Sequence, residues 1–445
     1  MTGWVHCQHP LAANTPVIWV YRFLFLPLLL LATPYYLWRM RRRGGYAENF
    51  GHRFGATDPL PARRPGVHRL WLQAVSVGEM LAIAPLLEAC HREGRTEVYL
   101  TTTTSTGYRL AKERYGPRTV GIGYFPLDFW AFSARAWRRV RPDLCILMEG
   151  ERWPEHVHQA RSRGVPVVSI NARLSDRSFR RSLRGRAILR PLSRGMTQVL
   201  ASSKRDAQRF KALGFEADRL QTTGNIKLDV QIPLLSEPEK RQLRRDLGLG
   251  DGLVLLGSST WAGEEVALLT ALKSARERGL KVSLLLVPRH AERREELRAL
   301  LEKSGLTFHF RSAGPAAGEV DVAVGDTTGE LRKFTQLADL VFTGKSLAPH
   351  EGGQTPVEAA VLGKPVLHGP RMTNFREIIR TLTEAGAVRK VETHSDLIAA
   401  TVELLEDSAQ REQLAAAAQA WHEENRGATE RTLAVIRAQL AGLDQ

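Results

Sequence analysis

Cysteine is scarce in this chain of 445 residues, which contains only Cys7, Cys90 and Cys145. They lie far apart and form no C-x-x-C pair, so the sequence provides neither a disulfide framework nor a cysteine zinc site. It also lacks D-x-D, H-E-x-x-H and a G-x-G-x-x-G turn between a strand and a helix. The usual carboxylate clamp for a nucleotide-bound divalent ion is therefore excluded, and we expect no metal and no cofactor.

Two short patterns suggest phosphate or metal sites, but their context argues against both. Gly344-Lys345-Ser346 matches the end of a phosphate loop, yet Asp339 stands where that motif requires its first glycine. His156 and His158 could ligate a metal only from a strand, and we predict a solvated helix face for them instead.

Acidic residues are outnumbered by basic ones, 47 to 63, which gives a formal net charge of +16. This balance favours polyanionic partners or an anionic membrane surface. The hydrophobic content of 43% and the charged content of 25% are those of globular proteins, so disorder and fibrous repeats are excluded.

Long apolar runs are absent except for one, at residues 17–38, which carries a single charge, Arg22. As a helix it would cover about 33 Å, enough to span a bilayer. Aromatic residues near both ends and four arginines within residues 39–43 predict a single anchor, with the rest of the chain in the cytoplasm. Two alternatives stay open: a helix lying in the membrane interface, disrupted by Pro27 and Pro34, or an apolar helix docked on the protein.

Short apolar runs alternate with helical stretches through the rest of the chain. The predicted strands are residues 70–72, 98–102, 144–148, 167–170 and 199–201, then 253–256, 282–287, 320–324, 340–342 and 366–367. This alternation predicts an α/β fold with two doubly wound parallel sheets. A polar stretch with Pro233 and Pro238 marks a boundary near residue 235. We predict an anchor with its basic flank over 1–44, a Rossmann-like domain over 45–235 and a second over 236–445 with terminal helices.

Charged residues follow the predicted strands of the first half. Glu79 begins a helix after the first strand, either as a first-turn glutamate favoured by the helix dipole or as a general base. Glu149 and Glu151 follow the predicted strand at 144–148. Two acids at the end of a strand are seldom needed for packing. Lys227 lies just before the predicted boundary. Parallel strands carry ligand sites at their carboxyl ends, so these groups are candidates for chemistry in a cleft between the two domains.

An arginine-dense segment lies between residues 173 and 194. It contains eight arginines and the single acid Asp176. Such a segment is typical of a site for phosphate or anionic lipid, and a nucleic-acid contact is also possible on composition alone.

Four short segments follow the strands of the second half, and all but Pro288-Arg289-His290 contain glycine. They are residues 257–261, 288–290, 325–331 and 351–358, and the last two carry glutamates. A helix amino end beside a carboxylate suits a nucleotide, because the amides can hold its phosphate and the acid its ribose hydroxyls.

These residues together resemble a known family, the 3-deoxy-D-manno-octulosonic acid (Kdo) transferases of lipopolysaccharide assembly. The motifs that carry the resemblance are A-V-S-V-G-E at 74–79, E-x-E-x-W-P at 149–154, N-A-R-L-S at 171–175, T-G-N-x-K at 223–227, P-R-H at 288–290, G-D-T-x-G-E at 325–330, G-G-x-x-P-x-E at 352–358 and G-P-x-x-x-N-F at 369–375. They occur in family order over nearly the whole chain.

The resemblance implies a GT-B glycosyltransferase with two Rossmann-like domains facing a cleft, behind an N-terminal anchor. It implies inverting, metal-independent transfer of Kdo from CMP-Kdo to lipid A precursor (lipid IVA) at the cytoplasmic face of the inner membrane. It also implies that Glu79 is the proton acceptor and that Glu149 and Lys227 stabilise the transition state. The implied CMP contacts are Pro288, Arg289, Thr328, Gly329, Glu330, Thr355, Pro356, Val357 and Glu358.

The chain departs from the family pattern at a few positions. The family often has histidine at Gln73, leucine at Arg152, asparagine at Glu155, methionine at Thr328, and His-Asn at Gln354-Thr355. The changes at 152 and 155 flank the acceptor side and suggest a different acceptor or a related sugar. The alternatives are therefore a GT-B transferase with another activated sugar or acceptor, and a non-catalytic membrane scaffold; no nucleic-acid partner is expected.

Overall fold

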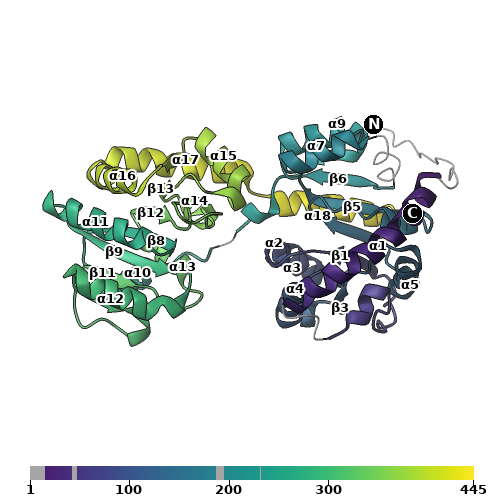
Figure 1. The fold of residues 1–445 in the computed structure, drawn as a ribbon, viewed down its shortest axis with the longest axis horizontal. Coiled ribbons are helices and arrows are strands. Elements are labelled where there is room, and N and C mark those ends of the chain that lie inside the picture. The colour runs from purple at the N-terminus through teal and green to yellow at the C-terminus, as the bar shows by residue number, and fades with distance from the viewer. Residues whose placement is uncertain (1–15, 43–47, 187–194, 231, 445) are drawn as a thin grey trace. The chain divides into compact units, whose positions relative to one another are not determined.

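The computed structural model of the protein describes residues 16–42, 48–186, 195–230 and 232–444. It divides into two compact units (Figure 1). Unit 1 extends to Asp229 and includes the last segment, Gly427–Gln445, and unit 2 is Val230–Arg426. Each unit contains a seven-stranded sheet.

Unit 1 is built on a parallel sheet with the order β3-β2-β1-β4-β5-β6-β7. Its strands are β1 (His68–Gln73), β2 (Thr96–Thr102), β3 (Gly121–Tyr124), β4 (Leu144–Met148), β5 (Val167–Ala172), β6 (Gln198–Ala201) and β7 (Leu220–Thr222). Its helices are α1 (Pro16–Arg42), η1 (Phe50–Phe54), α2 (Val77–Ala82), α3 (Ala84–Glu93), α4 (Ser105–Tyr115), η2 (Gly116–Arg118), α5 (Trp130–Val140), α6 (Pro154–Arg161), α7 (Asp176–Arg184), α9 (Lys204–Ala212), η3 (Ala217–Arg219), η4 (Ile226–Leu228) and α18 (Ala428–Ala441).

Unit 2 has a parallel sheet with the order β10-β11-β9-β8-β12-β13-β14. Its strands are β8 (Leu253–Thr260), β9 (Val282–Pro288), β10 (Phe308–Phe310), β11 (Val322–Val324), β12 (Leu340–Thr343), β13 (Val366–His368) and β14 (Val388–Lys390). Its helices are α10 (Glu237–Leu247), α11 (Glu264–Glu277), η5 (Ala291–Arg293), α12 (Arg294–Ser304), η6 (Arg311–Ala313), α13 (Leu331–Leu337), α14 (Val357–Val361), η7 (Thr373–Phe375), α15 (Arg376–Glu384), α16 (His394–Glu406) and α17 (Ser408–Asn425). The α/β prediction with two doubly wound sheets is confirmed.

Helices cover both faces of each sheet, which explains the uninterrupted apolar runs of the central strands. Every residue of β4 and of β9 is buried. Along β1 the side chains alternate between two cores: Leu70 and Leu72 pack with residues of α2 and α3, and Trp71 packs with Trp137 of α5. This alternation leaves the carboxyl ends of the strands as the places where polar residues can gather.

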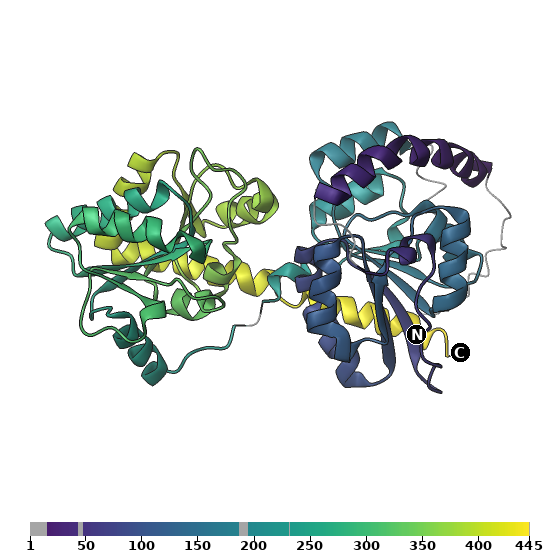
Figure 2. The ribbon, with the colours of Figure 1, turned by 60° about the horizontal axis from the view of Figure 1, so that its bottom comes forward.

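The C-terminal helix α18 belongs to unit 1, although the sequence placed it in a second domain over 236–445. Its residues Leu433 and Ile436 lie in a hydrophobic core of unit 1, and Figures 1 and 2 both show it against that sheet. The carboxylate of Asp229 accepts hydrogen bonds from the amides of Gly427, at 2.6 Å, and Thr429. The chain thus leaves unit 1 and returns to it at neighbouring points, which the alanine-rich composition of α18 did not reveal.

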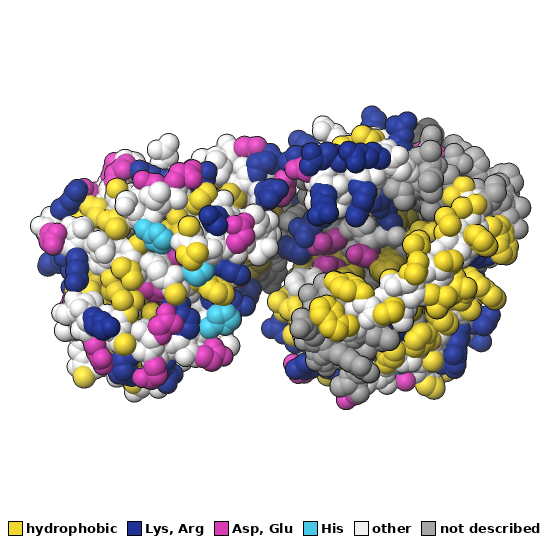
Figure 3. All heavy atoms as spheres, in the orientation of Figure 1, with side chains coloured by type: hydrophobic (Ala, Val, Ile, Leu, Met, Phe, Trp, Pro, Cys, Tyr) yellow, Lys and Arg dark blue, Asp and Glu magenta, His cyan; other side chains and the backbone are white. Residues whose placement is uncertain are grey.

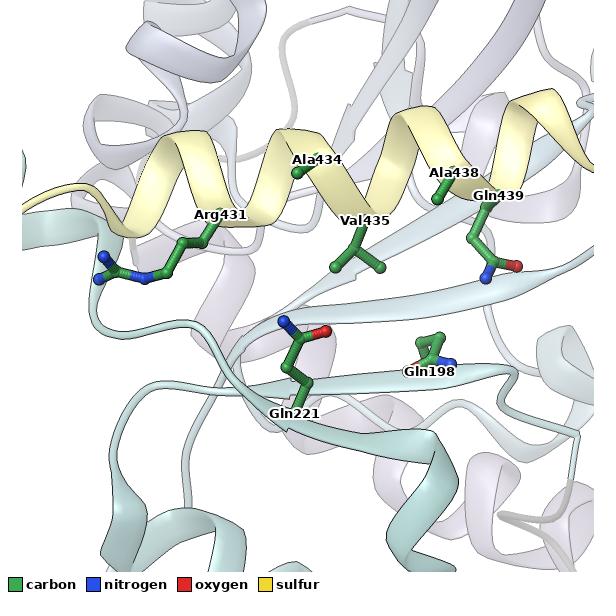
Figure 4. A pocket seen from close by; sticks show the side chains of 7 residues that line it. All are labelled: Gln198, Gln221, Arg431, Ala434, Val435, Ala438 and Gln439. Atoms are coloured by element: carbon green, nitrogen blue, oxygen red, sulfur yellow. The ribbon is translucent and has the colours of Figure 1, made fainter. Parts of the chain in front are cut away.

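A pocket lies where α18 crosses β6 and β7 (Figure 4). It is lined by Gln198, Gln221, Arg431, Ala434, Val435, Ala438 and Gln439. Arg431, its one charged lining residue, donates from Nε to the carbonyl of Thr223 at 2.8 Å. The pocket includes none of the residues that the motifs single out, so the candidate site is elsewhere.

Candidate active site

Glu79 lies in the first turn of α2, directly after β1. The Ser76 hydroxyl accepts from the Glu79 amide at 3.3 Å and donates to Glu79 Oε1 at 2.9 Å. Glu79 Oε2 accepts from the Val75 amide at 2.8 Å. The residue is 7% exposed, and these hydrogen bonds give its buried carboxylate polar partners. It therefore fills the capping role of a first-turn glutamate, and the same hydrogen bonds fix its carboxylate in place.

Glu149 and Lys227 form an ion pair at the same edge of the sheet. Glu149 follows β4, the neighbour of β1, and Lys227 lies in η4 after β7. Lys227 Nζ is 2.6 Å from Glu149 Oε1, and the Arg173 guanidinium is 3.0 Å from Oε2. Asn171, at the end of β5, accepts from the Ile226 amide at 3.1 Å and so ties the turn of Lys227 to the sheet. Three separate motifs thus converge on one charge cluster.

The electrostatics of this edge place Glu79 beside that cluster. Burial raises the pKa of Glu79, the Glu149 carboxylate raises it further, and Lys227 acts in the opposite direction. Burial, with the charges of Glu79 and Glu149, raises the pKa of Glu151 to about 7. Acids whose pKa is raised toward neutrality are suited to accepting and releasing protons.

The arginine-dense segment forms α7 at the same end of β5. Asp176 pairs with Arg205, at 3.1 Å, and with Arg209. Arg177, Arg180, Arg181 and Arg184 are exposed, and none of them has an ion-pair partner among the residues the structure describes. Of the other arginines in the segment, Arg190 and Arg194 lie outside the described residues. The exposed arginines leave α7 with a positive face open to an anion.

The turns of unit 2 are joined to one another at the carboxyl edge of its sheet. Pro288 ends β9, and the next residue, Arg289, donates its amide to the carbonyl of Thr260 at 3.1 Å, while its side chain is exposed. Glu330 precedes α13 and accepts from Thr327 Oγ1 at 2.5 Å and from Arg311 Nε at 3.3 Å. Although burial opposes it, these bonds lower the pKa of Glu330, so this carboxylate is ionised.

The segment 355–358 opens α14, and its last residue offers a free acceptor. Thr355 Oγ1 accepts from the Val357 amide at 3.2 Å, so this hydroxyl serves its own turn. Glu358 Oε1 lies 3.6 Å from an Arg332 nitrogen. Glu358 Oε2 is buried and has no hydrogen-bond partner among the described residues. A buried oxygen of this kind is available for a ligand hydroxyl.

Glu264 holds together two turns at this edge of unit 2, and none of the sequence motifs indicated this residue. The side chain is fully buried, and its carboxylate accepts from the amides of Trp261 at 3.0 Å, Lys345 and Ser346 at 2.9 Å and Leu347 at 3.3 Å. It thereby joins the turn after β8 to the turn after β12 and supports Lys345, whose Nζ lies 4.7 Å from the Trp261 ring. The only local signal is its spacing of three residues from Trp261 at a helix start.

Two motif interpretations can now be judged on the structure. Gly344 lies where two backbone segments approach closely. A Cβ at this position would lie 2.4 Å from the Ser259 carbonyl oxygen.

The prediction of a solvated helix face was wrong for His156, which is 1% exposed and lies 3.2 Å from both Trp137 Nε1 and the Pro126 carbonyl. Burial lowers its pKa to about 3, so it is a neutral core residue.

Comparison with known proteins places this chain in a family. Residues 48–230 match the family described as 3-Deoxy-D-manno-octulosonic-acid transferase (kdotransferase). The 3-deoxy-D-manno-octulosonic acid transferase of Bordetella pertussis is 35% identical over 427 residues, covering 92% of this chain and 96% of the relative. That of Haemophilus influenzae is 33% identical over 434 residues, covering 95% and 99%. This chain belongs to the Kdo transferases.

Solved structures show the fold of this Kdo transferase. The UDP-GlcNAc 2-epimerase of Neisseria meningitidis has a TM-score of 0.55 at 16% identity, over 84% of this chain and 100% of that chain. At this identity the likeness shows the fold alone, and together with the two seven-stranded parallel sheets it confirms the GT-B class. The family resemblance is confirmed as well, and the Kdo transferase is a glycosyltransferase of lipopolysaccharide biosynthesis.

Proposed function

We propose that this Kdo transferase moves Kdo from CMP-Kdo to a lipid A precursor (lipid IVA), with inversion and without a metal, at the cytoplasmic face of the inner membrane. The observation that carries the proposal is the fixed carboxylate of Glu79 within electrostatic range of Glu149 and Lys227. Unit 1 provides these groups, and unit 2 provides the strand-end turns for the donor. The facing cleft between the two units stays a prediction.

In the proposed step, Glu79 accepts the proton of the acceptor hydroxyl as its oxygen bonds to the anomeric carbon of Kdo. The bond from that carbon to the CMP phosphate breaks at the same time, and its electron pair leaves with CMP. A single displacement of this kind inverts the anomeric configuration. General-base catalysis of the attack contributes about 10²–10⁴-fold to the rate.

We assign charge stabilisation to Lys227, held by Glu149. Negative charge grows on the phosphate of CMP as the sugar leaves, and a fixed cation stabilises this charge most where water is excluded. The contact of 2.6 Å with Glu149 holds the Lys227 ammonium in position, and Arg173 adds a second cation to the same carboxylate. This arrangement supports the proposal that a side-chain cation does the work that a metal performs in other transferases.

For the donor we propose contacts in unit 2 with CMP. The proposed residues are Pro288, Arg289, Thr328, Gly329, Glu330, Thr355, Pro356, Val357 and Glu358. Hydrogen bonds and ion pairs join these turns to neighbouring segments of unit 2. The free Oε2 of Glu358 supports a contact with a ribose hydroxyl. Thr355 would contribute through its backbone, because its hydroxyl already accepts from the Val357 amide.

For the acceptor we propose a phosphorylated lipid at an anionic membrane surface. The net charge of +16 and the exposed arginines of α7 match lipid phosphates. Two residues on the acceptor side, Glu155 and Arg152, differ from the family pattern. Glu155 forms an ion pair with Arg22 of α1 at 2.8 Å, and Arg152 donates to Ser182 Oγ at 2.8 Å. Glu155 is thus occupied within unit 1, which favours the family acceptor over a different one.

The proposal is tested by incubating the full-length enzyme with CMP-Kdo and lipid IVA in membranes and identifying the lipid product by mass spectrometry. We expect a product heavier by whole Kdo residues, and the same yield in the presence of EDTA. Transfer from a different nucleotide sugar, with none from CMP-Kdo, would reject the proposed donor. Loss of activity in EDTA that added metal restores would reject metal independence.

The dependence of the transfer rate on pH should show how the charges around Glu79 affect its pKa. The base must be ionised, so the rate should fall as the pH drops through the raised pKa of Glu79, above the range of an ordinary glutamate. Lys227→Met removes a charge that lowers this pKa and should move the acid limb to higher pH. Glu149→Gln removes a charge that raises it and should move the limb to lower pH. Identical acid limbs in the wild type and both variants would show that another group titrates.

A further inference from the structure

Helix α1 turns one side toward unit 1 from Val17 to Tyr36. Its less exposed side chains recur every three or four residues and so form one stripe: Val17, Ile18, Tyr21, Arg22, Phe25, Leu29, Thr33 and Tyr36. The 27 residues of α1 cover about 40 Å at 1.5 Å per residue. A membrane-spanning helix would meet its cytoplasmic domain at one end only, whereas this stripe extends over the 20 residues from Val17 to Tyr36, about five and a half turns.

Polar bonds hold the amino-terminal half of α1 on unit 1. Arg22 Nε and Nη2 each donate to the Glu155 carboxylate at 2.8 Å, and Glu155 is fully buried. The Tyr21 hydroxyl donates to Asp128 at 2.6 Å, and Asp128 also accepts from the amide of Glu155. Detaching α1 would leave Glu155 as a buried charge without its cation, which is strongly unfavourable.

An aromatic contact joins the next turn of α1 to unit 1. The rings of Phe25 and Phe129 stack with centroids 6.4 Å apart. Nearer the carboxyl end, Tyr36 is half-buried, whereas its neighbours Tyr35 and Trp38 are exposed. The less exposed side of α1 therefore faces unit 1 from Val17 to Tyr36, and Figures 1 and 2 show the helix along the surface of that unit.

The opposite side of α1 is apolar and exposed. Its most exposed large side chains are Trp19, Val20, Phe23, Leu24, Leu28, Leu30, Leu31, Tyr35 and Trp38, and Phe23 and Leu31 reach 78% and 79%. Trp130 of α5, 51% exposed, adds to them. Figure 3 shows these apolar side chains as a continuous yellow band on one face of unit 1. A soluble surface rarely exposes an apolar band of this length, so the band needs a cover other than water.

We propose that α1 lies in the plane of the membrane, attached to unit 1 through Arg22 and Tyr21, and that its outer face is a docking surface for an anionic lipid bilayer. This replaces the spanning anchor with one of the alternatives that the sequence left open. Acyl chains cover the outer face, while lysines and arginines on the same face of unit 1 meet the headgroups (Figure 3). The inference deepens the proposed function, on which the choice of a lipid surface rests.

Cys7 provides a native probe of this geometry, because it precedes α1 while Cys90 and Cys145 are buried. The wild-type enzyme is treated with a membrane-impermeant maleimide in inside-out and right-side-out membrane vesicles, with Cys7→Ser as the background. We expect labelling of Cys7 in inside-out vesicles, on the side of the catalytic units, and protection in right-side-out vesicles. The reverse pattern would show a spanning helix and overturn the inference. Labelling requires no turnover, so the result stands apart from the test of the proposed function.

The depth of the exposed face gives a second measurement. Spin labels are placed singly at Val20, Leu28 and Tyr35, which are 56%, 62% and 61% exposed, in the Cys7→Ser background on vesicles of anionic phospholipid. An in-plane helix places all three labels at a similar shallow depth. A spanning helix places Leu28 far deeper than the other two, and a helix packed only on protein leaves all three accessible to water. Either of the last two results would overturn the inference.

Charge reversal tests the attachment itself. Arg22→Glu places two anions together and should release α1, so that the depths at Val20 and Tyr35 no longer agree. The double variant Arg22→Glu with Glu155→Arg restores the pair in reverse and should restore the wild-type depths. Unchanged depths in the single variant would show that this ion pair does not hold the helix.

Discussion

Glu79→Gln is expected to lower the rate of Kdo transfer by about 10²–10⁴-fold and to leave donor binding unchanged. Glutamine cannot accept the proton of the acceptor hydroxyl. Its amide oxygen can still accept from the Val75 amide, as Glu79 Oε2 does at 2.8 Å. The proposed donor contacts lie in unit 2, so CMP affinity should not change. Rates are measured by mass spectrometry of the lipid, and CMP affinity by calorimetry.

Ser76→Ala is the matched control for this variant. It removes both hydrogen bonds that the Ser76 hydroxyl makes with Glu79 but retains the carboxylate. We expect it to cost about 0.5–2 kcal/mol of stability, the usual cost of losing an N-cap, while most of the transfer activity remains. If both variants lost activity equally, Glu79 would act by supporting α2 and not as the proton acceptor.

Glu264→Ala is expected to destabilise unit 2 by about 3–5 kcal/mol and to abolish donor binding. The substitution leaves the amides of Trp261, Lys345, Ser346 and Leu347 without their shared acceptor. The turns after β8 and β12 would then lose the group that joins them. Denaturant unfolding measures the stability, and calorimetry with CMP measures binding.

Glu277→Ala controls for the loss of a carboxylate from the same helix. Glu277 is exposed near the end of α11, so its removal should change stability by less than about 0.5 kcal/mol and leave CMP binding intact. A Glu264 variant as stable as the Glu277 variant would show that water can satisfy the four amides, and Glu264 would then have no organising role.

The strands that the sequence revealed are those in the interior of the sheets. Predicted strand 144–148 coincides with β4, and 282–287 lies within β9, and both strands are buried along their length. The strands it missed are β3, β7, β10 and β14, which are the four sheet edges. β7 and β14 include exposed residues, because an edge strand is covered less than an inner one. Apolar runs therefore reveal a buried strand and miss an edge strand.

The candidate site could be predicted where its residues follow strands. Glu149 and Lys227 are 78 positions apart, yet both come after strands whose carboxyl ends share one edge, and the structure joins them at 2.6 Å. The partners of Glu264 and Glu155 could not be found in this way. Glu264 binds backbone amides, which carry no sequence signal, and Glu155 binds Arg22 from a helix whose composition indicated only a membrane anchor.

The return of the chain to unit 1 at residue 427 has a consequence for biosynthesis. Unit 2 is an insertion within unit 1, and α18, which packs in a hydrophobic core of unit 1, follows unit 2 in the chain. The ribosome must therefore synthesise all of unit 2 before the half of the enzyme that carries Glu79 can complete its interior.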